Sequence, residues 1–279
     1  MVKRIFFPVV ALVLLTVMPL AAQTQDTLRI LQYNLLFYGF YTSSCTSQNN
    51  NVDLKDTYLR TIIAHTRPDI FAVNEMGRGV QNAARIRDNV LNYNGEDRYS
   101  HATYTNTSNS SIVNMLFYDH HKFGIVYEAV ISTVLRDINL YTLYYKDPLL
   151  DGLRDTTFLS LIVAHFKAGS SVSDQQTRTA EAQAAMGFLA QHNIRGNLMI
   201  MGDFNMNSSF EQAFQLITWH PNEDVRFYDP IDLAGQWYNN PDMALHHTQS
   251  PRTGSDPCFV TGGLDDRYDM ILTSASILE

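Results

Sequence analysis

The chain has 279 residues, of which 45% are hydrophobic and 17% are charged. This length and composition are typical of a globular protein with a sizeable core and exclude a disordered chain, and no internal repeat or low-complexity tract is visible. Acidic residues outnumber basic ones by 28 to 20. A basic clamp around nucleic acid is therefore not expected, although bound divalent cations can still bring a polyanion to an acidic protein.

The first 22 residues have the pattern of an export signal. Lys3 and Arg4 precede an apolar run over residues 5–20, and small residues follow up to Ala22. This order predicts a signal peptide over residues 1–22. The alternative is a membrane anchor, but the run is short for a complete span and two prolines interrupt it. We expect an exported protein, periplasmic or extracellular, without a membrane span after cleavage and with a net charge of −10, since 18 basic and 28 acidic residues remain.

The two cysteines leave two interpretations open. Cys45 and Cys258 are the only cysteines of the chain. In an oxidising compartment they could form one disulfide. Two unpaired thiols are the alternative, and the sequence does not decide between them.

The N-terminal part predicts a strand, a helix and a second strand. Residues 28–33 alternate in polarity as a strand does, and Asn34 follows at its end. Asp53 is a candidate N-cap for the helix, and the apolar run 69–73 is the second strand, which ends before Glu75. A strand, helix and strand in this order form a βαβ unit, so the two strands should be parallel.

The middle of the chain predicts a different arrangement. Residues 111–118, 123–134 and 138–145 are three strands with short connections, which favours an antiparallel meander. Residues 158–164 form a further apolar strand, and His165 follows it.

The C-terminal part again alternates helices and strands. Ser173 and Gln176 form a candidate capping box for a long helix. The run 198–204 is a buried strand, a short helix is expected over 210–217, and residues 268–272 are a last apolar segment. The expected buried stripe of the long helix consists of Ala182, Ala185, Met186 and Leu189.

Polar side chains repeatedly follow the predicted strands. Asn34, Glu75 and His165 each follow one strand, and Asp203 and Asn205 lie together in the fourth case. Ligands of α/β proteins bind at the carboxyl ends of strands. Each residue alone could be a turn former, a helix cap or a structural histidine, but four such endings together predict one convergent site.

The same residues resemble the motifs of a known family. Asn34 in "QYNLL", Glu75 in "VNEM", His165 in "VAHFKAG", "GDFN" at 202–205 and Asp269 in "RYDMIL" resemble, in order, the endonuclease/exonuclease/phosphatase superfamily of deoxyribonuclease I-like metal-dependent phosphoesterases. The resemblance covers nearly the whole mature chain. It implies an α/β fold in which two packed mixed β-sheets form a sandwich flanked by helices, as one domain over residues 26–279, with the active site at one rim.

The resemblance also implies a metal and a set of roles. Glu75 would bind Mg²⁺, or alternatively Mn²⁺ or Ca²⁺, with Asn34 beside it in contact with metal or phosphate. Asp203 would orient or deprotonate the attacking water, and Asn205 would donate hydrogen bonds to the phosphoryl group.

The implied role of the histidine depends on a partner. His165 would contact the phosphate as a donor, with Asp269 holding its ring and favouring the charged form. Arg267 and Lys167 are weaker candidates for the same rim.

The resemblance implies a phosphoesterase, and one family motif has no counterpart. The family ends in a further strand that begins Ser-Asp-His, and no such sequence follows Asp269. We therefore expect a fragment that lacks the last strand and is catalytically weak as given. The expected function is that of an exported, Mg²⁺-dependent phosphodiesterase, acting as a monomeric nuclease on DNA or RNA. The alternatives are a phosphatase or phospholipase C-type enzyme acting on a phosphate monoester or phospholipid, and an inactive binding protein of the same fold.

Overall fold

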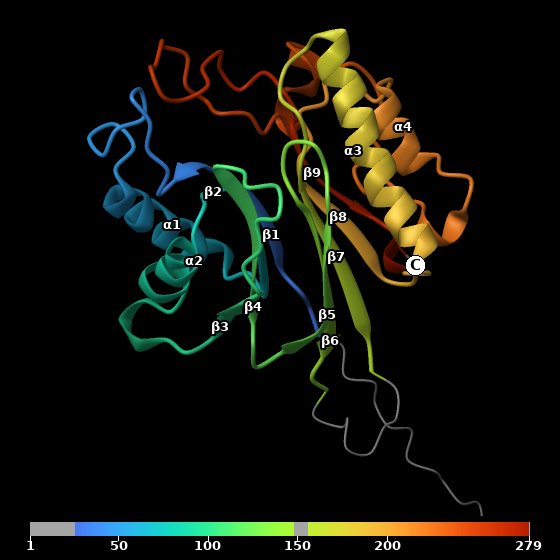
Figure 1. The fold of residues 1–279 in the computed structure, drawn as a ribbon, viewed down its shortest axis with the longest axis horizontal. Helices are drawn as coiled ribbons and strands as arrows, with labels where there is room; N and C mark the ends of the chain where they lie inside the picture. The colour runs from blue at the N-terminus through green and yellow to red at the C-terminus, as the bar shows by residue number, and fades with distance from the viewer. Residues whose placement is uncertain (1–25, 148–155, 279) are drawn as a thin grey trace, which may run out of the picture.

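The computed structural model of the chain describes residues 26–147 and 156–278, and the predicted signal peptide lies outside these residues. Within them, two sheets pack face to face with helices on both outer sides (Figure 1). The first sheet has the order β1-β2-β4-β3 and consists of β1 (Ile30–Tyr38), β2 (Ile70–Gly77), β3 (Tyr99–His101) and β4 (Ile112–Asp119). The second has the order β5-β6-β7-β8-β9 and consists of β5 (Phe123–Ile131), β6 (Ile138–Tyr145), β7 (Phe158–His165), β8 (Leu198–Asp203) and β9 (Asp269–Thr273).

The helices cover the outer faces of this sandwich. Helices α1 and α2 lie outside the first sheet, and α3 and α4 lie outside the second (Figure 1). The α-helices are α1 (Val52–Thr66), α2 (Val80–Ile86), α3 (Val172–Gln191), α4 (Gln212–Thr218) and α5 (Ala275–Leu278). The shorter helices are η1 (Arg87–Leu91), η2 (Tyr93–Gly95), η3 (Glu223–Val225) and η4 (Pro241–His246). None of the helices in the part of the chain that the structure describes is long and apolar enough to cross a bilayer.

The N-terminal βαβ unit is confirmed, with one correction at its helix. β1 and β2 are parallel neighbours, with Asn34 opposite Asn74. The N-cap of α1 is Asn51, whose side chain accepts a hydrogen bond from the backbone N–H of Leu54 at 3.0 Å. The prediction of Asp53 as the cap is therefore wrong. Asp53 lies in the first turn, where its carboxylate is favoured by the helix dipole and pairs with Arg85.

The predicted meander is only half correct. β5, β6 and β7 are antiparallel neighbours. β4, however, pairs with β2 and β3 in the other sheet, and the chain crosses between sheets after Asp119. A short connection between two apolar strands can form a hairpin within one sheet or cross to a second, packed sheet. The sequence pattern is the same in the two cases, because each arrangement buries the apolar side chains of the strands.

The long helix begins two residues earlier than predicted. Ser171, not Ser173, is the N-cap of α3, and Asp174 completes the capping box. The shorter carboxylate of Asp174 reaches back to the Ser171 backbone at 3.2 Å, so the predicted partner Gln176 is not needed. The predicted stripe of Ala182, Ala185, Met186 and Leu189 is fully buried, as expected.

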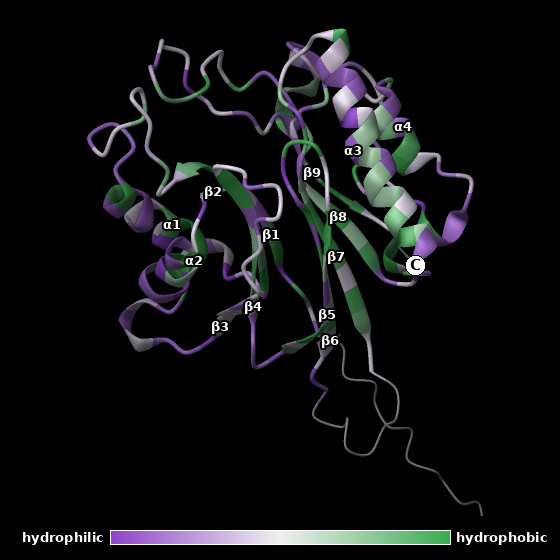
Figure 2. Ribbon diagram, viewed as in Figure 1, coloured by the Kyte–Doolittle hydropathy of each residue, from purple (hydrophilic) through white to green (hydrophobic). Residues whose placement is uncertain are grey.

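Two apolar cores follow from the alternation of side chains along the strands. In β7, Leu161 and Val163 face the first sheet, whereas Ile162 and Ala164 face α3 and α4. In β8, Met201 belongs to the core between the sheets. In Figure 2 the strands are largely apolar, whereas the helices and loops show polar and apolar residues side by side.

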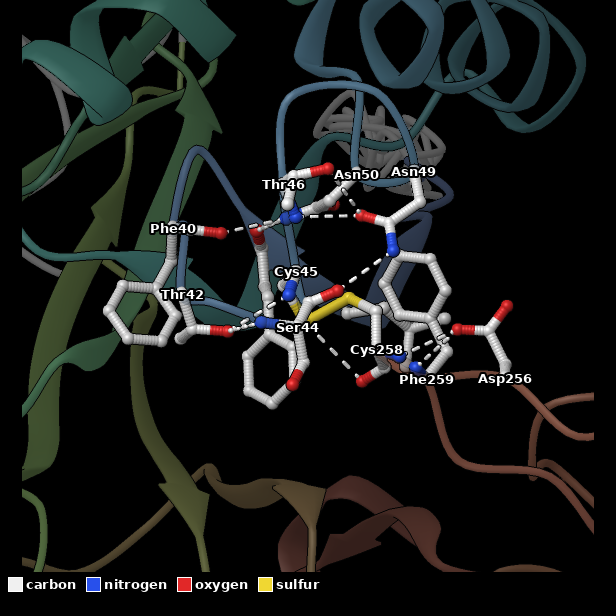
Figure 3. Close-up of a disulfide and its surroundings, with 12 residues drawn as sticks. Phe40, Thr42, Ser44, Cys45, Thr46, Asn49, Asn50, Asp256, Cys258 and Phe259 are labelled. Carbon is white, nitrogen blue, oxygen red and sulfur yellow. Dashed lines mark hydrogen bonds between the residues drawn. A yellow bond between two sulfur atoms is a disulfide. The ribbon is translucent and has the colours of Figure 1, made fainter.

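The two cysteines form a disulfide that joins distant loops. Cys45, in the loop after β1, is bonded to Cys258, in the loop before β9, across 213 residues of sequence (Figure 3). Among the two alternatives that the sequence left open, the bonded one is confirmed. Because β1 and β9 are edge strands of different sheets, the disulfide ties the two halves of the sandwich together at one end.

Candidate active site

Four polar side chains from both sheets meet at the rim where the parallel strands end. Parallel pairing of β1 with β2 brings Asn34 beside the end of β2, which carries Glu75. Parallel pairing of β7 with β8 places His165 directly opposite Asp203. Face-to-face packing of the sheets then brings the two pairs together, so the predicted convergence is confirmed.

An amide links the two carboxylates. Nδ2 of Asn34 donates to Oε1 of Glu75 at 3.0 Å and to Oδ2 of Asp203 at 2.9 Å. One ligand atom from each of Glu75, His165 and Asp203 lies within 4.8 Å of the others. The carboxylates at 75 and 203, which come from different sheets, thus face one another across a single site.

The backbone at this rim is bent out of regular geometry. Glu75 and Asn205 have left-handed φ values of 57° and 50°, and Leu36 and Phe37 have 49° and 60°. The backbone N–H of Leu36 donates to Oδ1 of Asn34 at 2.9 Å, and that of Phe37 donates to Oε2 of Glu75 at 3.2 Å. Non-glycine residues rarely adopt this region, and such residues cluster at functional sites.

The acidic groups of the site have perturbed pKa values. Burial raises the pKa of Glu75, although the hydrogen bond from Asn34 opposes the rise. Burial also raises the pKa of Asp203 well above its ordinary value, and the charges of Asp269 and Glu75 add to the effect. Burial raises the pKa of Asp269, which lies opposite Asp203 on β9, to about 6. Three acids in one buried place favour binding of a cation, which would lower all three pKa values.

The histidine differs from its predicted state. Burial and the nearby charge of Arg136 hold the pKa of His165 well below its ordinary value, so the ring is neutral. Its Nδ1 atom has no hydrogen-bond partner among the described residues. The groups beside Asp269 that oppose the rise of its pKa are Gln32 and Thr248, and its backbone N–H donates to Oγ1 of Thr248 at 2.9 Å. The prediction that Asp269 holds the ring in its charged form is therefore wrong. Asp269 begins β9 opposite Asp203, on the neighbouring strand β8.

A fully buried amide that the sequence reasoning missed connects the site to both sheets. Oδ1 of Asn74 accepts from Nε2 of Gln32 at 2.8 Å and from the backbone N–H of Asp203 at 2.9 Å. Its Nδ2 donates to Oδ1 of Asn114 at 2.8 Å and to the carbonyl of Ala164 at 3.1 Å. A polar residue inside the apolar run of β2 was the available signal.

One basic side chain near the site was also missed, and one expected basic side chain lies elsewhere. Arg136 donates to the carbonyls of His165 and Phe166 at 3.0 and 2.9 Å, and no local pattern marked it. Arg267 does not face the rim: it is buried in a bidentate pair with Asp229 at 2.7 and 2.9 Å. The buried carboxylate of Asp229 compensates the charge of Arg267 away from the rim.

The two remaining candidates lie near the site with their polar groups engaged. The ammonium of Lys167 pairs with Asp174 at 2.8 Å at the start of α3. The side-chain amide of Asn205 donates to the carbonyl of Phe166 at 3.2 Å, and its backbone N–H donates to Oδ1 of Asp203 at 3.1 Å. Asn205 therefore has one amide N–H left for a ligand, whereas Lys167 is held by its own counter-ion.

The donor set fits a divalent cation. Nε2 of His165 lies 3.9 Å from Oε1 of Glu75 and 3.8 Å from Oδ2 of Asp203, too far for hydrogen bonds but suitable for three ligands around one ion. Carboxylate oxygens suit Mg²⁺, and an added neutral imidazole also suits Mn²⁺. The unpartnered polar atoms of His165 and Asp269 are further groups that a bound ion and its waters would satisfy.

The site opens into a cleft of about 530 Å³. Besides the residues named above, the loops after β7 and before β9 contribute to its walls. The described lining residues include no Lys or Arg. The lining consists of Gln32, Tyr33, Asn34, Leu36, Glu75, His165, Ala168, Gly169, Asp203, Asn205, Thr248, Gln249, Ser250, Pro251, Val260, Tyr268 and Asp269.

Comparisons with known proteins agree with this geometry. The sequence matches the Endonuclease/Exonuclease/phosphatase family over residues 31–277. No curated protein matches the chain. Among solved structures, the chain is similar to an endonuclease/exonuclease/phosphatase family protein from Bacteroides thetaiotaomicron, with 15% identity, 91% of this chain and 85% of that chain covered, and a TM-score of 0.61.

Two further solved structures show the same fold. A mannosyl-6-phosphatase from Bacteroides thetaiotaomicron is 14% identical, with 90% of this chain and 86% of that chain covered and a TM-score of 0.56. D. rerio TDP2 complexed with a single-strand DNA product is 10% identical, with 90% and 85% covered and a TM-score of 0.54. The predicted fold class is thus confirmed, and the match over most of the sequence shows that the chain belongs to the Endonuclease/Exonuclease/phosphatase family.

Proposed function

We propose that the protein is an exported, divalent-metal-dependent hydrolase of phosphoester bonds. The observation that carries the proposal is the meeting of Asn34, Glu75, His165 and Asp203 around one point at the sheet rim. Such a set can hold one hard cation, and a bound cation promotes phosphoester hydrolysis by offsetting the negative charge of the phosphoryl group. Export is proposed from the sequence of residues 1–22 alone.

The residues divide into those that hold the ion and those that prepare the substrate. Glu75 and Asp203 would bind Mg²⁺ or Mn²⁺, with Asn34 fixing both carboxylates and His165 closing the ligand set. A bound ion would neutralise a phosphoryl oxygen and the charge that develops on the leaving oxygen. The free amide N–H of Asn205 would donate to the phosphoryl group.

The attacking water needs an acceptor for its proton. Oδ1 of Asp269 is buried and has no hydrogen-bond partner in the described part of the chain. Asp203 lies opposite it across β8 and β9. Either carboxylate can orient the water and accept its proton.

A small phosphoester agrees better with the cleft than a polymer does. A nucleic acid is held mainly by Lys and Arg side chains along its phosphates, and the described lining of the cleft contains none. Amides, hydroxyls and a few apolar side chains suit a compact, polar leaving group. The mannosyl-6-phosphatase with the same fold acts, by its name, on such a compound.

Nucleic acid is the second candidate, and a nuclease was the first expectation from the sequence. The similar D. rerio protein is complexed with a single-strand DNA product. In this chain Tyr33, which is 38% exposed, lines the cleft and offers a face on which a base could stack.

Hydrolysis assays test the proposal. We expect p-nitrophenyl phosphate, bis-p-nitrophenyl phosphate or a single-stranded oligonucleotide to be cleaved with Mg²⁺ or Mn²⁺, and cleavage to stop in excess EDTA. Asp203→Asn and Glu75→Gln should each lower kcat at least about a hundredfold, because each removes a charged ligand. Glu96→Gln, at an exposed position outside the cleft, is the matched control. Equal rates for Asp203→Asn and wild type would refute the assigned roles.

A further inference from the structure

The loop before β9 forms a defined lobe, residues 249–263, which we call the strap. At its base the backbone N–H groups of Gly262 and Gly263 both donate to the carbonyl of Arg252 at 3.1 Å. The backbone N–H of Gln249 donates to the carbonyl of Asp266 at 3.2 Å. These bonds close the lobe on itself and fix it to the β9 side of the cleft.

The far end of the strap is fixed to the opposite sheet. Oδ1 of Asp256 accepts from the backbone N–H groups of Cys258 and Phe259 at 2.8 and 2.9 Å, which shapes the tip (Figure 3). The Cys45–Cys258 disulfide then joins this tip to the loop after β1. Nζ of Lys55 on α1 lies 4.9 Å from the ring centre of Phe259 and adds a second contact.

The receiving loop is itself firmly held. Nδ2 of Asn50 donates to the carbonyls of Phe37 and Phe40 at 2.8 and 2.7 Å, and the backbone N–H of Cys45 donates to Oγ1 of Thr42 at 2.9 Å. The strap therefore runs between two rigid anchors, one on each sheet, beside the mouth of the cleft. Four of its residues line the cleft: Gln249, Ser250, Pro251 and Val260.

We propose that the strap, held by the Cys45–Cys258 disulfide, determines substrate specificity, and that Pro251 and Val260 contact the leaving group of a small phosphoester. This inference rests on the proposed function. Val260 is 58% exposed, so its side chain contributes little to the core and is available to a ligand. The metal-binding set lies on the strands, outside the strap, so the phosphate and its leaving group are recognised by different parts of the molecule.

The test is equilibrium binding of two probes by calorimetry in Mn²⁺, namely inorganic phosphate and phenylphosphonate. The Cys45→Ala/Cys258→Ala variant frees the tip of the strap, and Val260→Ser keeps the disulfide while removing the apolar contact. We expect both variants to weaken phenylphosphonate binding, by about fourfold for Val260→Ser, and to change phosphate binding less than twofold. Val126→Ser, 53% exposed on β5, is the control and should change neither.

The outcomes separate the strap from the proposed function. An unchanged ratio of the two affinities in Val260→Ser overturns the strap proposal, even where the cysteine variant fails to fold. If the ratio shifts as expected but no phosphoester is hydrolysed by wild type, the strap selects ligands and the proposed function is wrong. If wild type binds neither probe, both are overturned.

Discussion

Asp269 should make the protein less stable at neutral pH when no metal is bound. Burial raises the pKa of its carboxyl from 3.8 to about 6, so the native state favours the protonated form. For an acid with a raised native pKa, the stabilising contribution is complete below the unfolded pKa and is lost as the pH rises through the native one. The difference between 3.8 and about 6, at about 1.4 kcal/mol per pH unit, corresponds to about 3 kcal/mol lost between pH 4 and pH 6.5.

The substitution that tests this is Asp269→Asn, which keeps the shape and removes the charge. In EDTA at pH 7.5 we expect the variant to have a free energy of unfolding about 1–3 kcal/mol higher than wild type, and at pH 4 an equal one. Urea unfolding at several pH values between 4 and 7.5 measures both. A variant that is less stable than wild type at pH 7.5, or a difference that does not depend on pH, would refute this electrostatic reasoning.

Four further predictions concern stability. Asn74→Ala removes four hydrogen bonds, three of them buried, and should lower the free energy of unfolding by about 3–5 kcal/mol, measured in urea. The guanidinium of Arg178 lies 2.7 Å from the buried carboxylate of Glu211, and Arg178→Met leaves that carboxylate unpaired. The free energy of unfolding should fall by about 3–5 kcal/mol in the same assay. A rise would show that apolar packing can replace the ion pair. The Cys45–Cys258 disulfide restricts the unfolded chain by joining residues 213 positions apart, so its reduction should lower the free energy of unfolding by about 3–5 kcal/mol. Dithiothreitol should not change the free energy of unfolding of the Cys45→Ala/Cys258→Ala variant. Mg²⁺ at a hundred times its Kd should stabilise wild type by about 2.7 kcal/mol, and Glu75→Gln should lose this increment in thermal unfolding.

The convergence of the site could be predicted in part from topology. A βαβ unit makes its strands parallel, and parallel strands present their carboxyl ends at one edge, so polar residues after such strands lie together within each sheet. That the two pairs then meet depends on the face-to-face packing of the two sheets. The prediction that the site contains four particular residues did not require knowing where their side chains point. These are Asn34, Glu75, His165 and Asp203. The same logic explains why the buried stripe of α3 was correct, since a helix has only one face towards the sheet.

The errors arose where the outcome depends on contacts between distant segments. The partner of Asp269 is decided by which side chains of β1 and the loop before β9 reach it, and its position in the sequence does not reveal this. Whether β4 pairs with β5 or with β2 depends on the packing of two sheets whose apolar strands look alike. Asn74 was visible as a polar residue in an apolar strand, but its four partners come from β1, β4, β7 and β8.

The left-handed residues at the rim have a consequence for engineering the protein. Leu36, Phe37, Glu75 and Asn205 adopt conformations that cost of order 1–3 kcal/mol each and persist only because neighbouring hydrogen bonds hold them. Glycine would relax Leu36 or Phe37 and raise thermal resistance, yet it would also loosen the turn that presents backbone N–H groups to Asn34 and Glu75. Substitutions intended to raise thermal stability should therefore avoid these turns and be placed in the helices and at the sheet edges far from the cleft.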